Sequence, residues 1–458
     1  MQKTFLFYDI ETTGLSKTFD QVLQFAAIRT DTSLKEIERY ELKIKLNADV
    51  IPAPAAIITH GLGVNTFHEG ISEYEAILQI HRWLNQPGTI SLGYNTLGFD
   101  DEFLRFSFYR HLLKPYSHQY ANGCGRMDLY PMIVMFYLFK SHILNWPDVD
   151  GKLSLKLEQL NTCNQLAQGK AHDAMIDVEV TLALARRLMT ESEMWHYLQG
   201  YFQKETDLAR MQPLLKDKAL LIQGRIGAGA AFQCPVLFLG QHRHYRNQTV
   251  WLRLDTDTLQ HVTPETIQEQ TWSFHKKPAE PNFILPMSQR FLSHLNPSRL
   301  EQATQNQLWL SANPKIEQAI KEWHLNYKYP VYPTADSNAR LYIDGFWSRK
   351  EEIFCEQFHK ATPKEKSHLT ENAPHQTLYT LATRILGHFF PEDMSPSVRE
   401  YFEEDRHNRL SHETIDHQGN KKLTAKAALI EIQSLREMKQ LDSTALQLLD
   451  QYEIYLKK

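Results

Sequence analysis

The chain has 458 residues, more than one hydrophobic core usually supports, which predicts two to four domains. Hydrophobic residues make up 42% and charged residues 23%, as in ordinary globular proteins, and no run approaches the roughly 18 apolar residues of a membrane span. The net charge of −4 excludes a protein coated in positive charge, so any nucleic-acid contact must be confined to a patch. Four widely spaced cysteines without a CxxC pair indicate free thiols. Together with a start that shows no signal peptide, they predict a cytoplasmic protein.

The first element is a short apolar strand that ends in two acidic residues. Phe5 to Tyr8 is an apolar and aromatic run, which predicts a strand buried on both faces. Asp9 and Glu11 follow two residues apart, so both side chains should point to the same side of the strand. Adjacent carboxylates repel each other unless a cation lies between them, and oxygen ligands of this kind suit Mg²⁺ or Mn²⁺. The alternative is an exposed strand end whose acids cap the next turn.

Further strands lead to a second acidic motif. Residues 22–30 and 40–46 predict two more strands of an antiparallel meander, and residues 89–93 predict another strand. Asp100 and Asp101 then open a helix. Acids in a first helical turn are also favoured by the helix dipole alone, so this motif by itself does not require a metal.

A third motif favours a metal site over the simpler explanations of the first two. His172 and Asp177 lie at the start of a helix that we expect to run to about Leu188. A capping aspartate and a surface histidine would explain this segment on its own. Three acidic motifs in this order, on a strand-rich and then helical background, are rarely accidental and favour a metal-dependent site.

Together the motifs resemble the DEDDh class of 3′→5′ exonucleases, whose fold is ribonuclease-H-like. The closer resemblance is to the bacterial exonuclease I family, which degrades single-stranded DNA. The segments that carry it include Phe5-Leu-Phe-Tyr-Asp-Ile-Glu, Gln24-Phe-Ala-Ala-Ile-Arg-Thr-Asp, Phe99-Asp-Asp-Glu, Asn145-Trp-Pro and Ala171-His-Asp-Ala-Met. The resemblance implies an α/β protein with three domains: a ribonuclease-H-like exonuclease domain over 1–190, an SH3-like β-barrel with helical insertions over 195–345, and a C-terminal α-helical bundle over 346–458.

The resemblance also implies roles for individual residues. His172 would be the general base, because an imidazole titrates near neutrality. Glu11 and Thr12 would contact the terminal 3′ hydroxyl and so impose polarity. The ligands it implies for two Mg²⁺ ions, about 3.5–4 Å apart and replaceable by Mn²⁺, are Asp9, Glu11, Asp100 and Asp177. For the neighbouring acids Asp101, Glu102 and Asp173 we expect solvation, capping or support of those ligands.

Residues 105–160 should line the approach to this site. Arg105, Tyr116 and Tyr120 combine a cation with rings on which bases could stack, as in a non-specific single-strand groove. Core packing is an equally good explanation for the two tyrosines. Lys156 is a further candidate for phosphate binding, at a position where we expect the family to carry arginine.

The later regions contain a hairpin and a set of helices. Residues 235–240 and 249–255 predict a β-hairpin. Arg243, Arg246, Lys276 and Lys277 are available there to contact DNA phosphates, or simply form a solvated tip. Apolar spacing predicts an antiparallel bundle of helices over 377–390, 397–409, 423–438 and 443–455. In the family this region clamps the strand and gives processivity.

The function that the sequence favours is a Mg²⁺-dependent, processive 3′→5′ exodeoxyribonuclease that releases 5′-mononucleotides from single-stranded DNA. The resemblance implies a monomer active in DNA repair, recombination and mismatch repair, whose partner is the acidic C-terminal tail of the single-stranded-DNA-binding protein. The enzyme alternatives are a DEDDh exoribonuclease or a proofreading exonuclease. The alternative of another class is a catalytically inactive single-stranded-DNA-binding module.

Overall fold

The computed structural model describes residues 3–169, 173–215, 218–226, 232–438 and 441–457. The chain divides into two compact units. The first comprises Met1–Arg126, Gln168–Glu179 and Pro330–Lys458, and the second Met127–Ala167 and Val180–Tyr329. Within the described ranges, no helix is long and apolar enough to cross a membrane. The domain boundaries expected near 190 and 345 stay predictions.

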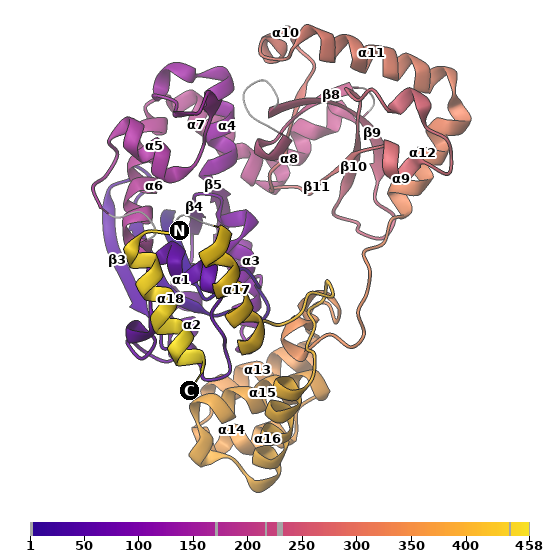
Figure 1. Cartoon of the computed structure of the whole chain (residues 1–458). Helices are drawn as coiled ribbons and strands as arrows, with labels where there is room; N and C mark the ends of the chain where they lie inside the picture. The colour runs from indigo at the N-terminus through magenta and orange to yellow at the C-terminus, as the bar shows by residue number, and fades with distance from the viewer. Residues whose placement is uncertain (1–2, 170–172, 216–217, 227–231, 439–440, 458) are drawn as a thin grey trace. The chain divides into compact units, whose positions relative to one another are not determined.

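Figure 1 shows the elements, with labels where there is room. The strands are β1 Thr4–Thr12, β2 Val22–Thr30, β3 Glu36–Lys43, β4 Thr89–Gly93, β5 Gly125–Asp128, β6 Asp148–Val149, β7 Lys152–Leu153, β8 Lys218–Ile222, β9 Gln233–Gln241, β10 Thr249–Arg253, β11 Ser273–Lys276 and β12 Phe283–Pro286. The helices of the first half are α1 Pro54–His60, α2 Glu73–Leu84, α3 Asp100–Arg110, α4 Leu129–Phe139, α5 Leu157–Asn164, α6 Ala174–Met189, α7 Ser192–Gln199 and α8 Lys204–Met211. Those of the second half are α9 Ile267–Gln270, α10 Gln289–Leu292, α11 Pro297–Ala312, α12 Pro314–Asn326, α13 Arg349–Lys360, α14 Pro363–Glu371, α15 Gln376–Phe389, α16 Pro396–Ser411, α17 Ala425–Met438 and α18 Ser443–Leu456.

The N-terminal sheet has the strand order β3-β2-β1-β4-β5, so the apolar strand β1 lies at its centre. β1 pairs antiparallel with β2 and parallel with β4, and every side chain of β2 is buried. The strands predicted over 22–30 and 89–93 are confirmed. The strand predicted over 40–46 lies instead at 36–43. Most of its side chains are exposed, because it forms an edge of the sheet.

The C-terminal helices lie close to their predicted ranges but do not form one bundle. α13, α14 and α15 share a core with residues of α2 and α3, and α16 packs on α15. α17 and α18, yellow in Figure 1, instead pack against α1. The apolar side chains of this contact include Leu23, Ile57, Phe67, Ile432, Leu435, Leu449 and Tyr452. The last two helices therefore share a hydrophobic core with residues of the N-terminal part of the chain.

The second unit contains the predicted hairpin, with β9 and β10 antiparallel around residues 242–248. The expected barrel is seen as an open five-stranded sheet, because the described strands follow the order β11-β10-β9-β8-β12 with β11 and β12 at opposite edges. The expectation that Lys276 is available to DNA is wrong. Its side chain is buried, and its Nζ donates to Asp207 at 2.6 Å. Arg243 is exposed but pairs with Glu322.

Candidate active site

The carboxyl end of β1 extends beyond its pairing with β4. β4 pairs with β1 only from Thr4 to Phe7, whereas β2 continues to pair beyond Glu11. Asp9 and Glu11 thus lie past the last residue of β1 that β4 covers. Because they are two residues apart on an extended strand, they occupy the same face.

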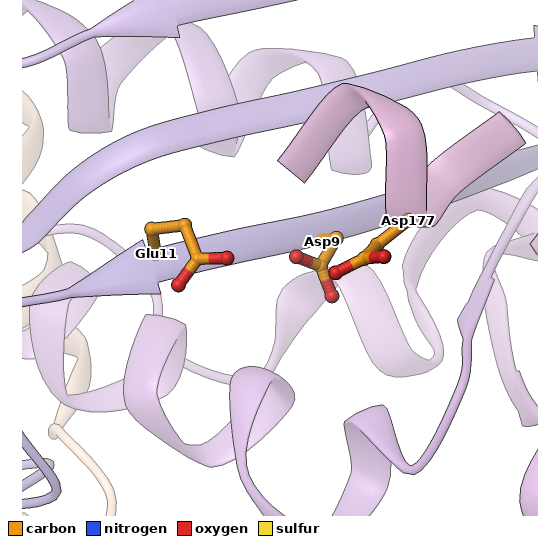
Figure 2. Close-up of side chains that lie close together, drawn as sticks. All are labelled: Asp9, Glu11 and Asp177. Carbon is orange, nitrogen blue, oxygen red and sulfur yellow. The ribbon is translucent and has the colours of Figure 1, made fainter. Parts of the chain in front are cut away.

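Asp177, in the first turn of α6, completes a cluster with these two acids (Figure 2). Asp9, Glu11 and Asp177 each offer one carboxylate oxygen, and these oxygens lie within 4.8 Å of one another. All three residues are half-buried. The carboxylates of Asp9 and Asp177 point toward each other, and that of Glu11 lies farther along β1 (Figure 2). Three convergent carboxylates form a donor set that suits a hard divalent cation.

The electrostatics of the cluster fit the same ligand. Burial, followed by repulsion from Asp100, Glu11 and Asp177, raises the pKa of Asp9 well above its ordinary value. Burial and repulsion from Asp177 and Asp100 raise the pKa of Glu11 to about 8. These carboxylates therefore repel one another when ionised, and a divalent cation would remove that cost.

The neighbouring strand, β4, brings Asp100 to the carboxyl end of β1. β4 ends at Gly93 and runs parallel to β1, so the carboxyl ends of both strands meet at one edge of the sheet. A Cβ at Gly93 would lie 2.6 Å from the carbonyl oxygen of Tyr8, so only glycine permits this close approach. Asp100 then begins α3 and is buried, and its charge raises the pKa of both Asp9 and Glu11.

The start of α6 is fixed by Asp173. Its side-chain oxygen accepts hydrogen bonds from the backbone N–H groups of Met175 at 3.1 Å and Ile176 at 3.3 Å. The expected capping role is seen, and it orients the first turn that carries Asp177. His172, the residue expected to act as general base, lies outside the described residues.

Asp101 does not face water but is buried in an ionic network beside Asp100. It accepts hydrogen bonds from Arg105 at 2.8 Å, from Arg126 at 2.6 Å and from His118 Nε2 at 2.9 Å. Although burial opposes ionisation, Arg126, His118 and Arg105 keep the pKa of Asp101 well below its ordinary value. Arg126 and His118 were not predicted from the sequence, since no spacing rule links positions 118 and 126 to a helix start at 100.

The expected substrate-binding residues Arg105, Tyr116 and Tyr120 lie near this network. The Arg105 guanidinium lies 5.1 Å from the Tyr116 ring centroid. Tyr116 is half-buried, so packing explains part of its role, whereas Tyr120 is 72% exposed. The exposed ring of Tyr120 is therefore the one of the two that is free to stack on a ligand.

Thr12 and Lys156 are the two other residues that we expected to bind the substrate. Thr12 is buried, and its hydroxyl donates to the Gly14 carbonyl at 2.8 Å, so this hydroxyl is already used within the turn. Lys156 precedes α5 in the second unit, with its side chain 70% exposed and 3.8 Å from Glu158. Binding of a 3′ end by Thr12 and of phosphate by Lys156 stay predictions.

Comparison with known proteins defines the class. The family model "Exonuclease" matches residues 6–185, and the model "Exonuclease I C-terminal domain" matches residues 335–458. Exodeoxyribonuclease I of Escherichia coli is 30% identical over 374 residues, which span 76% of this chain and 77% of that protein. The Haemophilus influenzae exodeoxyribonuclease I is 34% identical over 227 residues, 48% of each chain. The structure of E. coli exonuclease I in complex with a dA16 oligonucleotide has the same fold, with a TM-score of 0.86 at 24% identity over 100% of this chain and 99% of that one.

The fold and the acidic cluster thus define an exonuclease, and the matched model with this cluster indicates dependence on a divalent metal ion. More closely, the chain belongs to the exodeoxyribonuclease I family and is an exodeoxyribonuclease.

Proposed function

We propose that this protein is a Mg²⁺-dependent exonuclease that removes nucleotides from the 3′ end of single-stranded DNA. The observation that carries the proposal is the convergence of Asp9, Glu11 and Asp177 at the carboxyl end of β1. The E. coli relative was solved with single oligonucleotides, which supports a single strand as the substrate.

Asp9, Glu11 and Asp177 would hold the metal, and Asp100 would contribute to a second ion. Bound divalent ions supply charge neutralisation at the phosphate and a water of lowered pKa. The chain's own contribution is to hold these oxygens in place. β1 fixes Asp9 and Glu11, the Asp173 cap fixes the turn of Asp177, and the close β1–β4 approach fixes Asp100. His172 is proposed as the general base.

The test is a substrate comparison with 3′-labelled and 5′-labelled oligonucleotides. Single-stranded DNA, duplex DNA and RNA are each incubated with protein plus Mg²⁺ or EDTA. We expect loss of the 3′ label from single-stranded DNA only, with Mg²⁺ only, and 5′-mononucleotides as products. Digestion of RNA alone would support the exoribonuclease alternative. Retention of every label with tight DNA binding would support the inactive binding module.

The same proposal includes processive digestion of the strand. It also includes a role in repair, recombination and mismatch repair, carried out by a monomer in the cytoplasm. The four cysteines are free thiols, which fits a reducing compartment. A chase with unlabelled DNA after the enzyme has bound labelled strand would report processivity. Continued shortening of the labelled strand supports it, whereas an immediate stop argues against it.

We also propose the acidic C-terminal tail of the single-stranded-DNA-binding protein as a partner. A groove in the first unit offers matching charge, since the cations Lys45, Arg399 and Arg406 line it and outnumber the acids Asp49 and Glu403. Met394 and Phe402 supply apolar surface in the same groove. Calorimetric titration with a synthetic acidic tail peptide tests this, and unchanged affinity in an Arg399→Glu/Arg406→Glu variant would exclude this groove.

A further inference from the structure

The pairing of β1 with β2 changes register beside the acidic cluster. Glu11 lies opposite Gln24. The next residue, Thr12, lies opposite Val22, so β2 has one extra residue at this point, Leu23. Such a bulge bends the strand locally, and its shape decides where the neighbouring side chains point. The direction of the Glu11 carboxylate therefore depends on how Leu23 is held.

The side chain of Leu23 is held by the core that contains the last two helices. Leu23 is buried and belongs to the core that α17 and α18 share with the N-terminal part of the chain. Ile432 of α17, with Leu449 and Tyr452 of α18, is buried in the same core. Because a packed core leaves little free volume, the position of Leu23 follows that of these helices. The bulge thus links Glu11 to the far end of the chain.

The same two helices also hold the segment that leads into α1. The Tyr452 hydroxyl donates to the Pro52 carbonyl oxygen at 2.6 Å in the protein interior. The Ala55 backbone N–H donates to Glu431 Oε1 at 3.1 Å. α1 begins after Ala53, whose methyl group cannot cap a helix, so Glu431 of α17 supplies an acceptor for the first turn. Residues 52–55 are therefore fixed by side chains of α17 and α18.

This segment in turn contacts the turn that follows β1. The Ala53 backbone N–H donates to the Thr13 carbonyl oxygen at 2.6 Å. The Thr13 hydroxyl donates to Asp20 Oδ1 at 2.9 Å and accepts from the Gln21 backbone N–H at 2.9 Å. Thr13 is buried and lies two residues after Glu11. The position of this turn therefore helps to set the position of the carboxyl end of β1.

We propose that α17 and α18 position the metal-binding end of β1, with Tyr452 and Glu431 as positioning residues. The inference rests on the proposed function, because it concerns the geometry of the site that would bind the metal. Two links lead from the helices to Glu11, namely the packing of Leu23 and the hydrogen bonds of residues 52–55. Mg²⁺ demands near-ideal ligand geometry, so a metal site depends on the groups that orient its ligands.

The test is the double variant Tyr452→Phe/Glu431→Ala, which removes both hydrogen bonds and keeps the buried ring. We expect its dissociation constant for Mn²⁺, measured by electron paramagnetic resonance of the free ion, to rise about tenfold. Its kcat on single-stranded DNA with Mg²⁺ should also fall about tenfold, while KM and the affinity for oligo-dT in EDTA change less than about twofold. Glu431→Gln should behave like the wild type, because the amide oxygen still accepts from Ala55.

Two controls separate positioning from loss of stability. Tyr455→Phe/Glu437→Ala makes the same changes on the same helices, at a ring in the same core and at an exposed acid. It should keep the wild-type Mn²⁺ affinity and kcat. Val398→Ala leaves a cavity in the core between α15 and α16 and should lower the melting temperature without changing Mn²⁺ affinity.

Leu23→Ala tests the packing link without touching the hydrogen bonds, and it too should raise the Mn²⁺ dissociation constant about tenfold. Wild-type Mn²⁺ affinity and kcat in both Leu23→Ala and the double variant would overturn the inference. A loss of Mn²⁺ affinity that follows the melting temperature in every variant, Val398→Ala included, would overturn it as well. If the wild type neither binds Mn²⁺ nor cuts single-stranded DNA, the proposed function itself fails.

Discussion

Asp9→Ala is expected to abolish nucleotide release while DNA binding survives. Asp9 lies in the acidic cluster, where its pKa is raised by burial and by four neighbouring carboxylates. Removing it takes away a metal ligand, and we expect kcat to fall by at least about 10³-fold. Affinity for oligo-dT in EDTA should change less than about twofold. The measurements are initial rates with Mg²⁺ on 3′-labelled DNA, and anisotropy without metal.

Two variants control for this result. Glu404→Ala removes an exposed acid of α16 and should keep the full rate. Asp9→Asn should raise the melting temperature of the metal-free protein at pH 8, because it relieves repulsion from Asp100, Glu11 and Asp177. Residual hydrolysis by Asp9→Ala within tenfold of the wild-type rate would refute the assignment.

Metal removal and pH are expected to act on stability together. Glu11 has a pKa raised from its ordinary 4.5 to about 8, so the folded protein binds more protons than the unfolded chain between those values. Stability of the metal-free protein should therefore fall as pH rises from 4.5 to 8. A bound divalent cation favours the ionised carboxylates and cancels this loss.

We accordingly expect Mg²⁺ to raise the melting temperature more at pH 8.5 than at pH 6, with a rise on the order of 5 °C at saturating metal. Differential scanning fluorimetry in EDTA and in Mg²⁺ across this pH range measures it. The same titration on Glu11→Gln should show a smaller pH dependence. A rise that is larger at pH 6, or equal in both proteins, would show that ionisation of Glu11 is not the cause.

The sequence predicted β1 and its acids well because both signals are local. An apolar run followed by Asp9 and Glu11 sets a strand and a shared face through the two-residue period. The helix that carries Asp177 was predicted from its apolar spacing, and Asp177 itself from the third acidic motif. The convergence of these acids could be predicted only by recognising three motifs in order, since spacing along the sequence does not give a distance in space.

The features that the sequence did not predict depend on contacts between distant segments. From the sequence, Asp101 could be a solvated acid in the first turn of a helix, yet in the structure it is buried and pairs with Arg126 and His118. From the sequence, Lys276 was expected to be exposed near the hairpin, yet it is buried and pairs with Asp207, sixty-nine residues earlier. The helices of residues 425–456 have the apolar spacing of a bundle, and only tertiary packing directs them to α1.

Titration of the metal-free protein with Mn²⁺, followed by electron paramagnetic resonance of the free ion, tests the central claim most directly. The wild type should remove Mn²⁺ from solution, and Glu404→Ala should do the same. Asp9→Ala and Asp177→Asn should leave most of the ion free, because each removes one of the three converging oxygens. Equal Mn²⁺ binding by the wild type and Asp9→Ala would show that the ion lies elsewhere and would contradict the account.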